Sequence, residues 1–148
     1  SRQILTEILL EMLVGKSSEI YNSLYEKGLI NQTFESDFTC EKGYAFTSMG
    51  GESPAPQKAR TELLRGIAET DLTQNNFDRC KKVIIGRYLR LFNSVEKLSN
   101  SFVSSIFRGV DLFEYLEICN SVTLKEAMAR KEKHFTAENS AVSIIEPY

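Results

Sequence analysis

One hairpin pattern lies in a chain that is otherwise patterned for helices, and this contrast limits the folds open to it. Residues 34–40 alternate apolar or small side chains with polar ones, as a half-buried strand does. Glu41-Lys42-Gly43 is a short segment with a glycine, and it leads into a second strand over about 44–49. We therefore expect an antiparallel hairpin that ends at Gly50-Gly51, because glycine weakens strand pairing.

Most of the remaining chain carries apolar residues at helical spacing. Helix starts are predicted at Ser17 or Ser18, at Thr73 and at a capping box formed by Thr123 and Glu126. Helix ends are predicted at the glycines that follow apolar stripes. The expected helices cover about 2–14, 18–28, 56–69, 73–92, 95–109, a short stretch from Leu112 to Cys119, and a last one after Thr123.

Residues 140–146 are rich in β-branched side chains and predict a closing strand that stops at Pro147. The order of elements predicts an α+β fold. We expect a single domain over 1–148, a two-layer sandwich in which helices pack on one face of a small, mainly antiparallel sheet.

The first helix begins at the second residue with no capping segment before it. We therefore expect the chain to be a fragment of a longer one, truncated at its N-terminus, in which upstream strands extend the sheet. A hairpin without those neighbours has free edges, so the isolated chain is expected to self-associate.

Charge and composition exclude several functions. The net charge of −2 gives no field that would recruit nucleic acid, and no apolar run approaches a membrane span or a secretion signal. Cys40, Cys80 and Cys119 are odd in number and widely spaced, which suits reduced, buried thiols. The sequence predicts a cytoplasmic protein that binds neither nucleic acid nor membrane.

The chain offers few groups for catalysis. Peptidase motifs that bind zinc need two histidines at helical spacing, and His134 is the one histidine here, so the chain itself is expected to hold no metal and no catalytic residue. We assign His134 a structural place near a helix C-terminus, favourable to its charged form. Glu7 and Glu11 share a helix face, which we interpret as solvated and away from any cleft.

The stretch from Glu7 to Leu29, with its glycine-serine element between two helices and the segment Tyr25-Glu26-Lys27-Gly28-Leu29, resembles the insulinase/pitrilysin family of zinc metallopeptidases, which includes the mitochondrial processing peptidases. The resemblance continues through the hairpin and through Leu72-Thr73 to Ser121–Glu126. It is closest to a bacterial, processing-protease-like member, with Phe107–Phe113 in keeping.

The resemblance implies paired α/β domains that enclose a chamber, with the zinc motif in an N-terminal domain. An arginine and a tyrosine bind the substrate backbone in some members. Tyr25 stands at the arginine position, and Asn31, or Ile30 if the gap moves, stands at the tyrosine position, so neither matches. A heteromer whose partner subunit supplies both residues would show this pattern, and so would an inactive relative.

The resemblance therefore implies a non-catalytic C-terminal half-chamber domain that supports peptide binding. Its expected partners are the N-terminal domain of the same protein, a homologous partner subunit and a peptide substrate. Zinc is expected only in the N-terminal domain of an active parent. The alternative is a catalytically dead interaction or scaffold domain.

Overall fold

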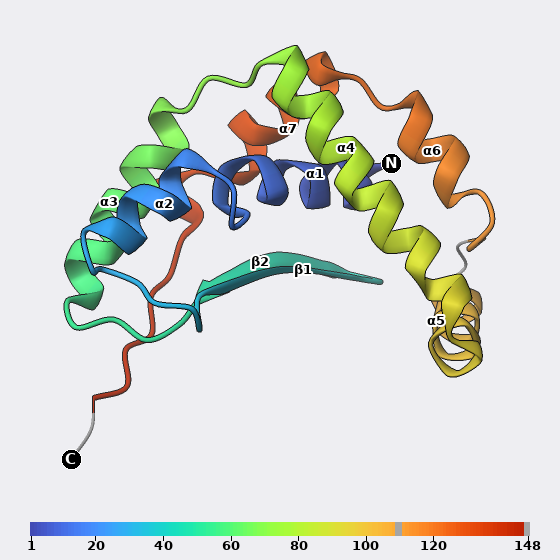
Figure 1. The fold of residues 1–148 in the computed structure, drawn as a ribbon, viewed down its shortest axis with the longest axis horizontal. Coiled ribbons are helices and arrows are strands. Elements are labelled where there is room, and N and C mark those ends of the chain that lie inside the picture. The colour runs from blue at the N-terminus through green and yellow to red at the C-terminus, as the bar shows by residue number, and fades with distance from the viewer. Residues whose placement is uncertain (109–110, 147–148) are drawn as a thin grey trace.

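The computed structural model describes residues 1–108 and 111–146. Figure 1 shows the helices as an arch over a two-stranded hairpin, with the C-terminal segment running out beneath the arch. In chain order the elements are α1 (Arg2–Val14), α2 (Glu19–Glu26), β1 (Glu35–Glu41), β2 (Tyr44–Gly50), α3 (Pro56–Glu69), α4 (Gln74–Arg90), the 3-10 helix η1 (Leu91–Asn93), α5 (Val95–Arg108), α6 (Tyr115–Ser121), α7 (Leu124–His134) and η2 (Ala137–Asn139).

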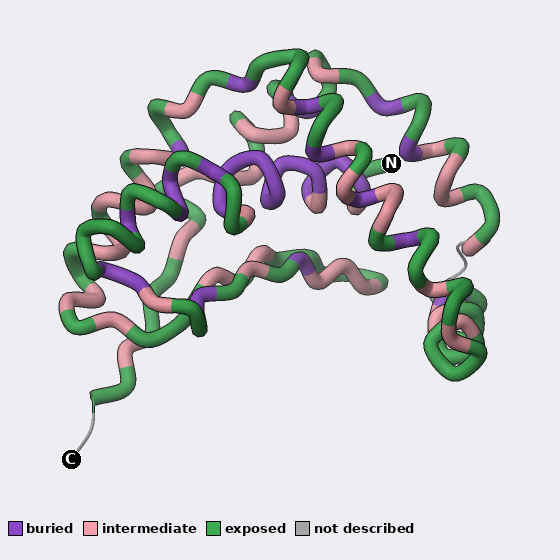
Figure 2. Tube along the Cα trace, viewed as in Figure 1, coloured by how far each residue is buried: buried purple, intermediate pink, exposed green. Residues whose placement is uncertain are grey.

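Helix α1 is the centre of the molecule, and Figure 2 shows it buried along nearly its whole length. Its sequence is apolar on almost every side, so it can be covered by α4, α7, α2 and β1 together. Ile8, Leu9 and Leu13 are 0% exposed. Burying each of these side chains contributes about 1.5–3 kcal/mol, which makes α1 the main source of core stability.

The hairpin is antiparallel, with Glu41 opposite Tyr44 and Glu35 opposite Gly50. Gly43 in its turn has a φ of 102°, a conformation that favours glycine. Since side chains alternate between faces, Phe38 and Thr47 point toward the helices, and Tyr44 and Phe46 point away from them. Helices α1 and α7 pack on the face of the sheet that carries Phe38 and Thr47, and the α+β prediction is confirmed.

The predicted helix starts are confirmed in detail. The side chains of Ser18 and Thr73 accept hydrogen bonds from the backbone N–H groups of their first turns. Thr123 and Glu126 form the complete capping box. Because caps depend on neighbours three residues away, they could be placed from local sequence alone.

The prediction of a closing strand was wrong. Residues 140–146 form no ladder, and the sheet of the described chain has two strands, β1 and β2. Instead Arg60 of α3 donates a hydrogen bond to Ser140 Oγ at 3.3 Å, so the segment follows α3. In the described chain the outer edge of β2 has no partner strand, so β-rich composition was not sufficient to form a third strand there.

Some helix boundaries also differ slightly from the predicted ones. The long helix α4 gives way to η1 at Leu91, and the short helix α6 begins at Tyr115, after Leu112. The predicted ends at Gly109 and Pro147 lie outside the described residues.

Candidate functional site

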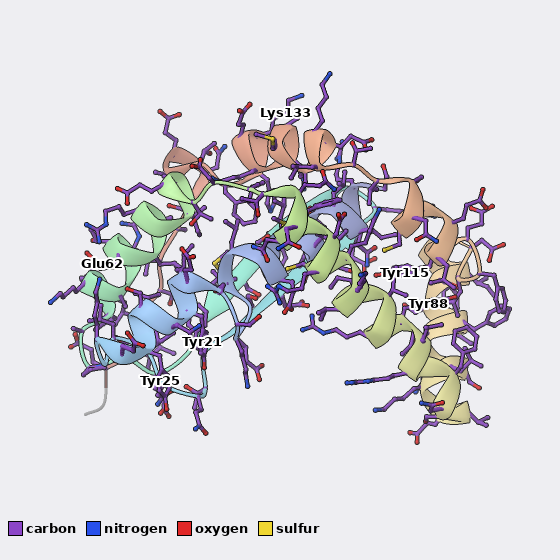
Figure 3. All side chains as sticks on the ribbon, turned by 45° about the horizontal axis from the view of Figure 1, so that its top comes forward. Tyr21, Tyr25, Glu62, Tyr88, Tyr115 and Lys133 are labelled. Carbon is purple, nitrogen blue, oxygen red and sulfur yellow. The ribbon has the colours of Figure 1, made fainter. Side chains whose placement is uncertain are left out.

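Tyr25 and Asn31 lie on either side of the turn that follows α2. Tyr25 is 44% exposed, and its ring stacks on that of Tyr21 with 6.1 Å between the ring centroids. The two residues are labelled close to each other in Figure 3. Asn31 Oδ1 accepts from the backbone N–H of Thr33 at 2.9 Å, and its Nδ2 donates to Glu52 at 2.9 Å. Ile30 is buried. Asn31 therefore joins the loop before β1 to the chain leaving β2, whereas Tyr25 presents its ring to solvent.

A hollow lies between β1, α1, α4 and α5, and we call it the β1 groove. Its volume is about 620 Å³. One wall comes from α1, the floor from α4, and the facing wall from α5. The groove is lined by Gln3, Glu7, Leu10, Glu11, Gly15, Ser36, Asp37, Phe38, Ile84, Arg87, Tyr88, Leu91, Asn100, Ser101, Ser104, Ser105, Asp111, Leu112 and Tyr115.

Glu11 and Arg87 form an ion pair at 2.5 Å in the wall of this groove. The side chain of Glu11 is 9% exposed and that of Arg87 is 59% exposed, so one partner is buried and the other reaches solvent. Gly15 makes room for the carboxylate, because a Cβ there would lie 2.8 Å from Glu11 Oε1. Losing the cation would leave a mostly buried charge without its partner, which is costly.

Glu7 lies one turn before Glu11 and holds α6 against α1. Its carboxylate accepts from the Tyr115 hydroxyl at 2.8 Å and from Gln3 Nε2 at 2.8 Å. The interpretation of Glu7 and Glu11 as solvated, with no cleft near them, was wrong. It failed because α1 is covered on nearly all sides, so that even its polar positions meet other helices.

Tyr115 and Tyr88 complete the wall with stacked rings, 4.6 Å between centroids, and they lie together in Figure 3. Burial, and then the charge of Glu7, raise the pKa of Tyr115. Its hydroxyl therefore stays protonated and donates to Glu7, while Tyr88 donates to the Leu112 carbonyl at 2.9 Å. These two hydroxyls are fixed donors within the fold, which leaves the carboxylates as the acceptors available to a ligand.

His134 is the last residue of α7, as predicted, but its role differs from the expected one. Its Nε2 lies 2.7 Å from Thr47 Oγ1, and its ring meets Phe38 edge-on at 5.5 Å. Burial, and then the Arg130 charge, lower the pKa of His134. The ring thus packs α7 onto the hairpin as a neutral group, and a favourable charge at the helix end is not its contribution.

The described residues bring together no group of side chains that could hold zinc. The single imidazole is engaged by Thr47, and over residues 1–108 and 111–146 no three His, Cys, Asp or Glu side chains lie close enough to hold a metal ion. Cys80 and Cys119 are fully buried and unpaired, and burial raises the pKa of Cys80 to about 11. Cys40 is only partly buried, which corrects the expectation for that thiol.

Helix α5 presents an exposed apolar face. Val95 is 83% exposed, Ile106 60% and Phe107 78%. A patch of this kind marks an interaction surface more often than a free one. None of the helices in the described part of the chain is long and apolar enough to cross a membrane.

Comparison with known proteins decides the family. No protein-family profile matches the chain. It is 32% identical over 142 residues to the uncharacterized zinc protease YmfH of Bacillus subtilis strain 168, a match that covers 95% of this chain and 33% of the relative. A crystal structure of an M16-like peptidase from Alicyclobacillus acidocaldarius superposes with a TM-score of 0.87 at 25% identity, covering 93% of this chain and 34% of that one.

The chain is an insulinase-family peptidase-like domain. A zinc protease from Bordetella pertussis Tohama I shares the fold with a TM-score of 0.68 at 14% identity, over 94% of this chain and 82% of that one. The insulinase-family domain spans about a third of the length of the curated relative that it matches.

The sequence did not point to the groove of this insulinase-family domain. Glu11 and Arg87 are 76 residues apart in the sequence, and Glu7 and Tyr115 are 108 residues apart, so no local motif joins either pair. One indication was present: Glu11 lies in the otherwise apolar stretch from Ile8 to Val14, four residues before a glycine, and such a glutamate calls for a buried partner of opposite charge.

Proposed function

We propose that the chain is a non-catalytic C-terminal half-chamber domain of a zinc-dependent insulinase-family peptidase, and that it supports the binding and processing of peptides. The observation that carries the proposal is the combination of a zinc protease as relative along 95% of the chain with a single histidine that is engaged by the hairpin. A domain of this family without a zinc motif contributes shape and contacts to a site whose metal lies elsewhere.

The zinc ion of an active parent would then be held by the N-terminal domain of the same protein, in the cytoplasm of a bacterium. The exposed face of α5 supports contact with that domain or with a homologous subunit, because Val95, Ile106 and Phe107 would be covered in such an assembly. The outer face of the hairpin, where Tyr44 and Phe46 are 59% and 50% exposed, supports a second contact.

A second candidate is a catalytically dead interaction or scaffold domain, or a non-catalytic subunit of a heteromeric peptidase. Tyr25 and Asn31 favour it, since they stand where some members have the arginine and tyrosine that bind substrate, and Asn31 is engaged within its own loop. A role of Tyr25 or Asn31 in binding substrate is likewise a proposal, and it rests on these same positions.

The test uses the full-length protein that carries this chain. We expect one zinc ion per chain by metal analysis and cleavage of a quenched fluorescent peptide that stops when the metal is chelated. Replacing the only histidine of this region, His134→Gln, should leave the zinc content unchanged. Loss of zinc in that variant, with its fold intact, would place the metal in this domain and refute the proposal. If the full-length protein binds no zinc and cleaves no peptide, both alone and together with its homologous subunit, the scaffold function is the proposal that remains.

A further inference from the structure

A second hollow lies between α3, β2 and the segment that follows α7, and we call it the α3 cavity. Its volume is about 440 Å³, which is within the range of about 300–1,000 Å³ that is typical of small-molecule sites. Residues 139–144 form one wall, and Figure 1 shows this segment running down beside α3 toward the C-terminus. The last segment, which forms no strand, thus encloses a space that the neighbouring side chains do not fill.

Helix α3 gives the cavity a wall that changes character along its length. Positions 56, 59, 60, 63, 64 and 67 line the cavity and recur at the spacing of one helix face. Arg60 lies in the first half of this face, whereas Leu63 and Ile67 make its second half apolar. Ile67, Leu24 and Ile30 all line the cavity and are 3%, 2% and 6% exposed, so its apolar end borders the hydrophobic core.

Arg60 is the partly buried cation of this cavity. Its Nη2 donates to Ser140 Oγ at 3.3 Å, and no other hydrogen bond of its guanidinium is present in the described chain. None of the ion pairs between described residues involves Arg60. A planar guanidinium with unused donors binds a carboxylate through two parallel hydrogen bonds. Arg60 can therefore bind an anionic group that enters the cavity.

The other charges around the cavity do not compensate this positive end. Glu52 also lines the cavity, but its carboxylate already accepts from Asn31 Nδ2 at 2.9 Å. Lys133 of the lining is a further, exposed cation. Helix α3 begins after Ala55, which gives no side-chain cap, and its first turn has no acidic residue. The positive end of the α3 dipole therefore adds to the attraction for an anion near Arg60.

A buried hydroxyl beside the cavity lacks a partner. Thr136 lines the cavity, and in the part of the chain that the structure describes its Oγ1 is buried without a hydrogen bond. It lies four residues before Ser140, the hydrogen-bond partner of Arg60. An unpaired buried hydroxyl costs free energy, which a polar ligand atom offsets when it supplies the missing partner.

The separation of the charged and apolar ends limits the length of a ligand. Arg60 and Ile67 are seven residues apart, which at about 1.5 Å per residue is roughly 10 Å along α3. An extended alkyl chain, with bonds of about 1.5 Å in a zigzag, covers this span in roughly eight bonds.

We propose that the α3 cavity binds a medium-chain fatty acid, whose carboxylate pairs with Arg60 and whose alkyl chain lies along Leu63 and Ile67 toward the core. An apolar pocket with a few polar groups that fix the orientation of the ligand is the common form of a small-molecule site. This binding goes beyond the proposed function, because it involves neither zinc nor the cleavage of a peptide.

The test is isothermal titration calorimetry of octanoate and of octan-1-ol, which have the same chain length and differ in charge. The full-length protein that carries this chain is used with its metal chelated, so that the carboxylate has no zinc to bind. We expect one octanoate per chain. Arg60→Gln should weaken octanoate binding by about fivefold or more, because a charge-assisted pair is lost, and should change octan-1-ol binding by no more than about twofold.

Arg65→Gln is the matched control. Arg65 belongs to the same helix, its side chain is 55% exposed and pairs with Glu62 at 2.7 Å, and it does not line the α3 cavity. We expect this variant to change octanoate binding by no more than about twofold. Ser140→Ala removes the hydrogen-bond partner of Arg60 and keeps its charge, so octanoate binding should again stay within about twofold of wild type.

Three results would overturn the proposal. The first is a wild-type protein that binds no octanoate, or binds many molecules of it without saturation. The second is equal weakening by Arg60→Gln and Arg65→Gln, which would assign the effect to overall charge. The third is an Arg60→Gln variant that loses octan-1-ol as strongly as octanoate, which would mean that the substitution alters the cavity and that no carboxylate pairs with Arg60. Arg60→Lys, which keeps the charge, should retain most of the octanoate binding, and a loss as large as that in Arg60→Gln would also contradict the pairing.

Discussion

Gly51 is the position where the chain leaving β2 passes closest to the chain entering β1. A Cβ at Gly51 would lie 2.7 Å from Phe34 Cα and 2.8 Å from Phe34 N, both backbone atoms that no rotamer change can move. At the neighbouring Gly50 a Cβ would meet nothing within 4 Å. Gly51→Ala and Gly50→Ala therefore make the same chemical change one residue apart, in opposite surroundings.

Carbon atoms pack at about 3.5–4.0 Å, so an alanine at 51 must push the two segments apart by roughly 1 Å. That movement strains the bond from Glu52 N to Thr33 Oγ1, which measures 3.0 Å. Forcing extra atoms into a packed site costs about 1–3 kcal/mol, and the lower entropy of the unfolded alanine chain offsets about 0.4–1 kcal/mol. We expect Gly51→Ala to lose about 1–2 kcal/mol and Gly50→Ala to lose nothing or gain up to about 1 kcal/mol.

The measurement is urea unfolding of wild type and both variants, followed by far-UV circular dichroism because the chain has no tryptophan. Equal slopes and different midpoints would show that stability, and not the extent of unfolding, has changed. If Gly51→Ala proved as stable as Gly50→Ala, the close approach of the two segments, and the loop geometry that aligns β1, would be refuted.

Three other predictions concern side chains described above. Cys40 should react with a thiol reagent in the folded protein far faster than Cys80, which is 0% exposed and has a raised pKa; equal rates would refute the burial of α4. The lowered pKa of His134 means that the folded state resists protonation of its ring, so the free energy of unfolding should fall as the pH drops below the ordinary histidine pKa of about 6.5. Urea unfolding at about pH 7 and about pH 5.5 should show a smaller fall for His134→Gln than for wild type. An equal fall in both proteins would refute the assignment. The chain should self-associate in light scattering over a dilution series and Phe107→Glu should shift it to monomer, whereas a wild type that is monomeric throughout would contradict a role for the α5 face.

The hairpin and the helix caps were predictable because their causes are local. The alternation in 34–40 and the glycine at 43 specify a turn within ten residues, and Thr123 needs only Glu126 to form its capping box. The helix ranges followed from apolar spacing in the same way. Family resemblance then supplied the arrangement of these elements, which periodicity by itself does not determine.

The groove and the course of the last segment were not predictable, since both depend on which elements meet. Glu11 has the same sequence context whether its helix is on the surface or in the centre, and only the packing of α4 against α1 brings Arg87 to it. Residues 140–146 have strand-like composition, but composition does not determine whether a segment pairs with a neighbouring strand.

The short connection through η1 determines the direction in which α5 leaves α4. The 3-10 helix η1, Leu91–Asn93, and Ser94 join the end of α4 to a helix of 14 residues, and Figure 1 shows α5 at the outer end of the arch. A helix of that length measures about 21 Å, so turning it by about 10° at η1 carries its tip through about 4 Å. A small change of the angle at η1 would therefore alter the width of the β1 groove, which is lined by both α5 and β1.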